Sequence, residues 1–316
     1  MTHGKATVLG INGHIGHHIA KAFVDNGWDV AGFGRSNRHP LAGVRFVAGD
    51  ADNIEDIRGA IGDSEVVVNA LNLPYAEWNK GRMEALYGRV VEAMGKGRTM
   101  LFPGNIYNYA ATDRLVTPAL EQRPETPRGA IRVRSEAILH DAARRGDMQV
   151  IILRAGDFYG PESSTDWFDQ VILREAGKGR VSTLGGRGVG HAWAYLPDLA
   201  RAFEVLACER GRLGEFESFH FEGHFVTPEE MTTAVVTAAP VPLKASRFPW
   251  VLLSILGLFD PTMREAAKMG YLWQNPMMLR DARLDILLGE NFDTPFAEAV
   301  AETVRPYFAA AASAAA

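Results

Sequence analysis

The N-terminal segment Ala6 to Gly16 carries three glycines at a spacing that suits the binding of a phosphorylated cofactor. Gly10 lets the chain turn sharply, Gly13 lets the backbone approach a pyrophosphate, and Gly16 lets a helix pack closely on a strand. A run of β-favouring residues precedes the glycines, and an apolar helical period follows them. This strand, turn and helix predict a dinucleotide site rather than a purely structural glycine turn.

Three further residues of this turn belong to the predicted cofactor site. They are Asn12, His14 and Ile15, which lie between the glycines or next to them. The amides that open a helix face a bound phosphate. We therefore expect the backbone of His14 to touch phosphate and its ring to be solvated.

The end of the second predicted strand, Asp29 to Phe33, bears on the choice of cofactor. A carboxylate near this point holds the ribose hydroxyls of NAD, whereas an arginine suits the 2′-phosphate of NADP. Here Gly34 is followed by Arg35 and Ser36. The pattern predicts NADP rather than NAD, and the alternative is that Arg35 is only a solvated loop residue.

Further cofactor contacts are expected where the next strands end. Asp50 follows the predicted strand Val44 to Ala48, and it either accepts a hydrogen bond from the adenine amino group or caps the helix that begins near Asn53. The remaining residues predicted to line the cofactor cleft are Ala51, Ala70, Leu71 and Ala155.

The segment Pro103 to Tyr109 follows the predicted strand Thr99 to Phe102 and supplies candidates for proton transfer. Ligands bind at this carboxyl edge of an open α/β sheet. Tyr107 is the first candidate acid for a developing alkoxide, with Arg128 or Arg132 expected to lower its pKa; alternatively it only packs the loop. Asn105 either donates to a carbonyl oxygen or holds the turn.

Strand and helix patterns alternate about six times up to Pro161 and then become irregular. This alternation predicts an α/β fold: a doubly wound parallel Rossmann sheet with a smaller mixed C-terminal substrate lobe. We expect residues 1–165 to form the dinucleotide-binding domain, with residues 190–208 returning to it. Residues 166–316 would form mainly the substrate-binding lobe.

Composition narrows the classes of partner. The 316 residues are 47% hydrophobic with a net charge of -5, so a large core is possible and nucleic acid is not an expected partner. Cys208 is alone, which excludes an internal disulfide and fits the cytoplasm. The longest apolar run, Trp250 to Phe259, is too short to span a membrane, so no membrane partner is expected. No set of residues has metal-ligand spacing, so no metal is expected.

Several ordered motifs resemble the extended short-chain dehydrogenase/reductase family, which contains nucleotide-sugar epimerases and dehydratases. They are Gly10-x-x-Gly13-x-x-Gly16, Gly49-Asp50, Arg154-x-x-x-x-Tyr159-Gly160-Pro161, Tyr195-Leu196-Pro197-Asp198-Leu199-Ala200 and, late in the chain, Arg283-Leu284-Asp285. The resemblance implies a Rossmann domain, a C-terminal substrate lobe and a homodimer.

The chain departs from this family in the helix that carries the catalytic pair, Tyr-Gly-x-x-Lys. Gly129 and Glu136 fit the family pattern, but Arg128 stands in the tyrosine position and Arg132 in the lysine position. An arginine does not give up a proton near neutral pH, so Arg128 cannot replace the tyrosine as the acid. Arg132 can still bind ribose through its fixed charge.

Two classes of function therefore stay open, with the first favoured. One is an atypical NADP-linked oxidoreductase acting on a carbonyl compound or a nucleotide-sugar-like small molecule, with Tyr107, Asn105, Arg132 and Arg128 as its candidate catalytic residues. The other is a non-catalytic NADP(H)-binding sensor or regulatory protein.

Overall fold

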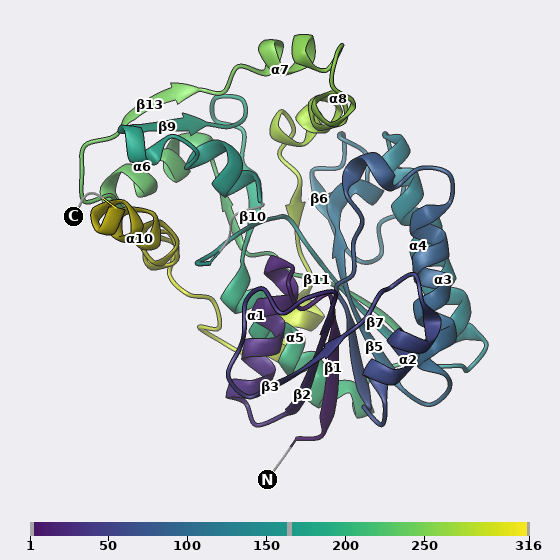
Figure 1. The fold of residues 1–316 in the computed structure, drawn as a ribbon. Helices are drawn as coiled ribbons and strands as arrows, with labels where there is room; N and C mark the ends of the chain where they lie inside the picture. The colour runs from purple at the N-terminus through teal and green to yellow at the C-terminus, as the bar shows by residue number, and fades with distance from the viewer. Residues whose placement is uncertain (1–2, 163–165, 315–316) are drawn as a thin grey trace.

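The structure is a computed structural model that describes residues 3–162 and 166–314. Its centre is a parallel seven-stranded sheet of order β3-β2-β1-β4-β5-β7-β11, and a smaller lobe covers one edge of this sheet (Figure 1). The strands of the sheet are β1 (Lys5–Leu9), β2 (Asp29–Gly34), β3 (Val44–Ala48), β4 (Val66–Asn69), β5 (Thr99–Asn105), β7 (Gln149–Ala155) and β11 (Phe216–His220). The predicted fold class is confirmed.

Helices cover both faces of the sheet (Figure 1). One face packs against α1 (His14–Asp25) and α5 (Leu196–Glu209), and the other against α2 (Ile54–Ile61), α3 (Arg82–Met94) and α4 (Pro127–Arg144). Central strands are therefore apolar on both sides, and every residue of β4 is buried. This explains why the strand patterns in the sequence are nearly continuous rather than alternating.

The lobe consists of short strands and helices around the carboxyl edge of the sheet. Its strands are β8 (Asp157–Tyr159), β9 (Arg180–Thr183), β10 (His191–Tyr195), β12 (His224–Val226) and β13 (Lys244–Arg247). Its helices are α6 (Pro228–Ala238), α7 (Trp250–Leu256), α8 (Pro261–Lys268) and α10 (Phe296–Ala314). The pair β6 (Leu115–Val116) and β14 (Met278–Leu279) and helix α9 (Ala282–Leu288) complete the regular elements. The helical turns are η1 (Tyr75–Glu77), η2 (Ile106–Asn108), η3 (Phe168–Ile172), η4 (Ala176–Lys178), η5 (Arg210–Arg212) and η6 (Met269–Trp273).

Some elements differ from the sequence expectation. Residues 216–220 lie in the large sheet beside β7, although the sequence analysis placed them in the lobe, because β11 is short and half apolar. Strand β5 continues through Asn105, since Gly104 and Asn105 pair with Arg154 and Ala155 of β7. The segment after Trp167 forms two helical turns, η3 and η4, in place of a full α-helix. Within the described residues, no helix is long and apolar enough to cross a bilayer.

The glycine turn between β1 and α1 is held by backbone contacts that leave no room for side chains. Gly10 has a φ of +89°, a left-handed conformation that favours glycine. A Cβ on Gly16 would lie 2.4 Å from the carbonyl oxygen of Gly10, which is far inside contact distance. A Cβ on Gly13 would meet only that oxygen, at 3.3 Å. The first and third glycines are therefore required by the fold, whereas a side chain at the second would make a single tight contact.

This geometry predicts that Gly16→Ala destabilises the chain by about 1–3 kcal/mol, because the methyl group must push the helix away from the strand. The matched control is Gly88→Ala in α3, where a Cβ would meet nothing within 4 Å. That change is expected to stabilise the helix by about 0.5–1 kcal/mol. Urea unfolding of both variants measures the difference, and equal stabilities would contradict the assigned contact.

Candidate functional site

A cavity of about 1030 Å³ lies between the carboxyl edge of the sheet and the lobe. Side chains and backbone from the ends of β4, β5 and β7 form its base, and residues of α7, α8 and β13 form its far wall. Seven of the predicted site residues line it: Ile15, Ala70, Leu71, Asn105, Tyr107, Arg132 and Ala155. The structure thus brings most of the predicted cleft residues together.

The ring of His14 is not solvated, which corrects the sequence expectation. Its side chain is 5% exposed, Nδ1 contacts the carboxylate of Asp166, and Nε2 lies 3.0 Å from the carbonyl oxygen of Pro161. His18 also places Nε2 3.0 Å from that oxygen, and burial lowers the pKa of His18 to about 3. The start of α1 is therefore fixed to the segment that follows β8, and only the backbone of His14 is offered to a phosphate.

Asn12 connects the glycine turn to the loop after β2. Its Nδ2 donates to the carbonyl oxygen of Ser36 at 2.7 Å, and its Oδ1 accepts from the backbone N–H of Arg38 at 3.1 Å. Gly34 lies under this side chain, where a Cβ would come within 2.6 Å of Nδ2. The arrangement explains the glycine at the end of β2 and leaves Arg35 and Ser36 exposed.

Asp50 does not cap α2, because Asn53 performs that role by accepting from the backbone N–H of Glu55. The Asp50 carboxylate instead accepts from the backbone N–H of Asp52 at 2.9 Å. Ala51 is held by Arg89, which donates to its carbonyl oxygen at 3.0 Å. Both residues lie on an exposed turn outside the residues that line the cavity.

Buried donors at the cavity have no protein acceptor and so fit a bound dinucleotide. Nδ2 of Asn69 and Nε of Arg132 are both buried without a hydrogen-bond partner, and both residues line the cavity. A buried donor normally has an acceptor, because leaving it unpaired costs about 1–3 kcal/mol. The oxygens of a nicotinamide dinucleotide could supply these acceptors.

Tyr107 lies in η2 and shares a hydrogen bond of 2.8 Å with the hydroxyl of Tyr75 from η1. Burial raises its pKa well above the ordinary value, and the nearby charge of Asp157 raises it further. The positive charge of Arg132 is too weak an influence to reverse this. The expected lowering of this pKa is therefore wrong, and Tyr107 stays protonated as a hydrogen-bond donor at neutral pH.

Asn105 lines the cavity at the end of β5. Its Oδ1 accepts from the backbone N–H of Tyr107 at 3.0 Å and so begins the η2 turn. This contact fulfils the turn role considered in the sequence analysis. The other role, donation to a substrate oxygen, uses the amide nitrogen and is compatible with it.

Arg132 and Arg128 occupy successive turns of α4 but face different surroundings. Arg132 is 8% exposed, lines the cavity, donates to the hydroxyl of Tyr87 at 2.6 Å and lies over the ring of Trp78. Arg128 is 3% exposed and is not among the cavity-lining residues. Its Nε donates to Glu265 of α8 at 3.0 Å, and its guanidinium lies over the ring of Tyr75. Arg128 therefore connects α4 to the lobe.

Glu136 continues this buried face of α4 and binds Arg154 of β7. The guanidinium donates to both carboxylate oxygens, at 2.7 and 3.2 Å, and also to the carbonyl oxygen of Asn105. Arg154 is fully buried, so the ion pair is shielded from water. Two motifs of the sequence resemblance thus meet directly and fix the end of β5.

An aspartate that lines the cavity is paired with a histidine that does not line it. Asp157 lines it, and its Oδ2 lies 2.8 Å from Nε2 of His191. The His191 ring stacks on Trp273 with centroids 3.8 Å apart, and its Nδ1 lies 3.2 Å from the carbonyl oxygen of Leu272. The signal in the sequence was weak, because 34 residues separate the two members of the pair.

Basic and hydroxyl side chains line the lobe wall. Arg174, Arg247, Ser182 and Ser246 all belong to the cavity. Residues 180–183 and 244–247 are brought side by side by the parallel pairing of β9 and β13. Arg247 could not be assigned from the sequence, since β9 and β13 have four residues each and β13 is exposed. Glu175 lines the cavity as well, so the two arginines carry one positive charge more than this carboxylate balances.

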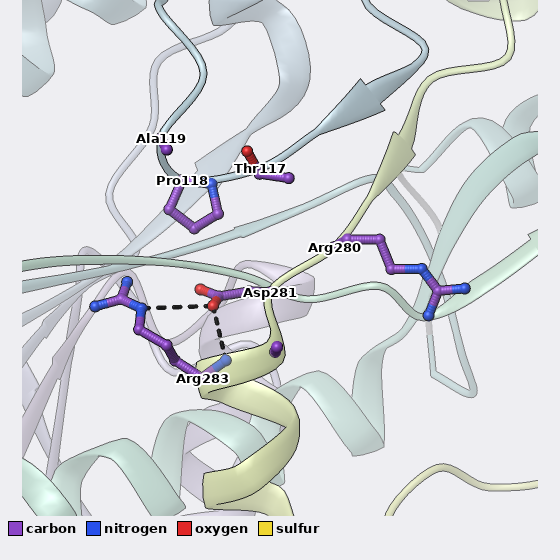
Figure 2. Close-up of a pocket in the computed structure, with 7 residues that line it drawn as sticks. Thr117, Pro118, Ala119, Arg280, Asp281 and Arg283 are labelled. Atoms are coloured by element: carbon purple, nitrogen blue, oxygen red, sulfur yellow. Dashed lines mark hydrogen bonds and ion pairs between the residues drawn. The ribbon is translucent and has the colours of Figure 1, made fainter.

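A second pocket, of about 570 Å³, lies between residues 117–119 and 280–283 (Figure 2). Its charged groups already have structural partners: Asp281 accepts from the backbone N–H of Arg283 and begins α9, and the Arg283 guanidinium binds Glu217 at 2.9 Å. Arg280 contacts Glu222. These groups stabilise the end of β14, so this pocket is not the candidate site.

The parallel sheet, the glycine turn and a cavity at the carboxyl edge define a protein of the Rossmann dinucleotide-binding class. Comparison with known families makes this more specific. Residues 6–217 match the model of the NAD dependent epimerase/dehydratase family, and the chain belongs to this family. No curated protein was found to match significantly in sequence.

Solved structures with the same fold cover nearly the whole chain. MoeE5, solved in complex with UDP-glucose and NAD, is 18% identical with a TM-score of 0.77 over 97% of this chain and 99% of its own. The enzyme WbmH of Bordetella bronchiseptica, in complex with NAD+, is 19% identical with a TM-score of 0.72 over 96% and 98%. UDP-glucose 4-epimerase from Brucella ovis, in complex with NAD, is 16% identical with a TM-score of 0.75 over the same shares.

The buried contacts of Arg128 predict that Arg128→Met lowers the free energy of unfolding by about 1–3 kcal/mol, because the carbonyl oxygen of Tyr75 loses its donor and Glu265 keeps only its pair with Lys268. Arg134→Met is the matched control on the same helix, since its pair with Glu84 at 2.9 Å is exposed. The control is expected to change stability by less than about 1 kcal/mol. Guanidinium unfolding measures both; equal losses would mean that the buried pair contributes no more than the exposed one.

Proposed function

We propose that the chain is an oxidoreductase that transfers a hydride between a nicotinamide dinucleotide and a nucleotide-sugar-like substrate. The observation that carries the proposal is the single cavity of about 1030 Å³, which reaches from Ile15, beside the glycine turn, to Arg174 and Arg247 in the lobe. Pockets for one small ligand range from about 300 to 1,000 Å³. This cavity therefore suits the nicotinamide half of a cofactor together with a second molecule.

The basic wall supports a substrate that carries phosphate. Arg174 and Arg247 offer planar guanidinium groups that bind phosphate oxygens in pairs. The hydroxyls of Ser182 and Ser246 lie in the same wall. MoeE5, a structural neighbour, was solved with UDP-glucose. A diphosphate placed here leaves the sugar between the wall and the carboxyl edge of the sheet.

Different observations favour NAD and NADP as the cofactor. MoeE5 and WbmH were solved in complex with NAD or NAD⁺, which gives no support to the NADP preference expected from the sequence. Within this chain, the argument for NADP is limited to the end of β2, where no carboxylate stands and Arg35 and Ser36 are exposed. We take NAD as the cofactor that the family indicates, and Arg35 as the residue at which a preference for NADP is tested.

Tyr107 is our candidate for the proton donor in reduction. Its phenol is protonated at neutral pH and lines the cavity beside Asn105. A protonated phenol can give its proton to a developing alkoxide, which is far more basic. In the opposite direction the same group would take the proton back as a phenolate, a form that the nearby carboxylate of Asp157 disfavours. Arg132 would hold the ribose, and Arg128 would act only through the position of α4.

The second candidate function is a cofactor-binding protein without turnover. It is favoured by one observation: Arg128, which the sequence resemblance puts in the family's tyrosine position, binds Glu265 and does not line the cavity. Incubation of UDP-glucose and UDP-galactose with NAD⁺ and NADP⁺, and of a panel of carbonyl compounds with NADH and NADPH, separates the two. Turnover supports the enzyme, whereas binding of both redox forms without turnover supports the sensor. A homodimer and a cytoplasmic location stay predictions.

If Arg35 binds a 2′-phosphate, Arg35→Ala is expected to weaken NADPH binding by about tenfold or more, since a charge-assisted hydrogen bond is lost. NADH binding is expected to change less than about twofold, because it has no phosphate there. Calorimetric titration measures both affinities, and Arg38→Ala, a neighbouring exposed arginine, is the control. An equal effect on the two cofactors would remove the argument for NADP.

If Tyr107 is the proton donor, Tyr107→Phe is expected to lower turnover by about 10²-fold or more with the cofactor affinity unchanged. Tyr109→Phe is the matched control, because Tyr109 is buried two residues away and its hydroxyl faces His220 at 3.3 Å instead of the cavity. Turnover of that control is expected to stay within about threefold of the parent. Equal rates for Tyr107→Phe and the parent would exclude this role.

A further inference from the structure

A carboxylate on the sheet-facing side of α5 has no cationic partner. Glu204 is 9% exposed, and within the described residues no lysine or arginine forms an ion pair with it. Its Oε1 accepts from Nε1 of Trp28 at 3.0 Å and from the thiol of Cys208 at 3.1 Å. Both donors are neutral. The guanidinium of Arg210 lies close by, 5.5 Å from the ring centroid of Trp28, but it pairs with Glu65 at 2.7 Å and not with Glu204, so this position favours a cation.

Two ligands preferred by soft divalent metals lie beside this carboxylate. Cys208 follows Glu204 by one turn of α5, which places both side chains on the same side of the helix. His3 approaches from the start of the chain, with Nδ1 3.7 Å from Sγ of Cys208. Its ring stacks on Trp28, the residue that also donates to Glu204. One atom from each of the three residues lies within 4.8 Å of the others.

From these contacts we infer that His3, Glu204 and Cys208 form a binding site for Zn²⁺. A tetrahedral zinc ion lies about 2.3 Å from a thiolate and about 2.0–2.1 Å from an imidazole nitrogen, which separates the two ligands by about 3.6 Å. The observed separation is 3.7 Å. The carboxylate oxygen is 3.1 Å from the sulfur and needs to move by roughly half an ångström. Water would be the fourth ligand.

Binding exchanges one proton for the metal ion. The thiol of Cys208 now donates to Glu204, and a zinc ion binds the thiolate, so the thiol proton is released to solvent. The ion would join the start of β1 to α5, which packs on α1. The site lies outside the cavity and so stands independently of the proposed reaction.

The sequence predicted no metal, because a ligand set is recognised there only when its residues are close together in the chain. His3 and Cys208 are 205 positions apart, so only the fold brings them together. The other group of candidate ligands, His14 with Asp166 and Asp169, is less suitable. Both ring nitrogens of His14 already have partners, and Tyr307 donates to Asp169.

The test is a titration of the metal-free chain, without an added N-terminal tag, with Co²⁺, whose bond to a thiolate absorbs in the near ultraviolet. We expect one equivalent of Co²⁺ to give this band and Zn²⁺ to remove it. Cys208→Ser is expected to abolish the band, and it leaves the fold intact because its side chain is exposed. Zn²⁺ is also expected to raise the thermal unfolding midpoint of the parent and not of Cys208→Ser.

Two further variants test the other ligands. His3→Ala and Glu204→Gln are each expected to weaken Co²⁺ binding by about tenfold or more. Glu209→Gln is the matched control, because Glu209 lies on the same helix and pairs with Arg212 at 3.1 Å. It is expected to bind Co²⁺ as the parent does. Absence of the thiolate band in the parent, or equal binding by Cys208→Ser, would overturn the proposal.

Discussion

Three charged side chains lie on one buried face of α4, where water cannot solvate them. The contacts that they make instead position the helix at the cavity. Arg128, Arg132 and Glu136 are spaced four residues apart, so they lie on one side of the helix. Arg128 binds the lobe through Glu265, and Glu136 binds β7 through Arg154. Arg132, between them, keeps a buried Nε without a protein acceptor at the cavity. Arg128 and Glu136 therefore position the helix, and Arg132 keeps a donor that a ligand can use.

This arrangement explains how a family member can differ at its usual catalytic tyrosine and still keep an organised cavity. The side chain in that position is taken out of the cavity by its bond to the lobe, and the cavity instead receives two hydroxyls that share a hydrogen bond, those of Tyr75 and Tyr107. Burial keeps the Tyr107 phenol protonated, which favours donation over acceptance of a proton. The carboxylate of Asp157, which also lines the cavity, adds to this effect through its negative charge.

Features that depend on neighbours in the chain could be predicted from the sequence, and features that depend on distant contacts could not. The glycine turn and the alternating sheet were predicted because strand, turn and helix signals are local, and the structure confirms the fold. The partner of Arg128 lies 137 residues away, and the pKa of Tyr107 depends on burial that no local pattern reveals. The seventh strand was missed because β11 is only partly apolar. Arg247 became a site candidate only when β13 paired with β9.

The central claim is that this cavity and the glycine turn together bind a nicotinamide dinucleotide. Calorimetric titration of the purified chain with NAD⁺, NADH, NADP⁺ and NADPH tests it most directly, with Gly13→Asp as the comparison, since a carboxylate there would meet the phosphates. We expect at least one dinucleotide to bind at one site per chain, and Gly13→Asp to abolish that binding while the chain stays folded. Failure of all four to bind the parent chain would contradict the account.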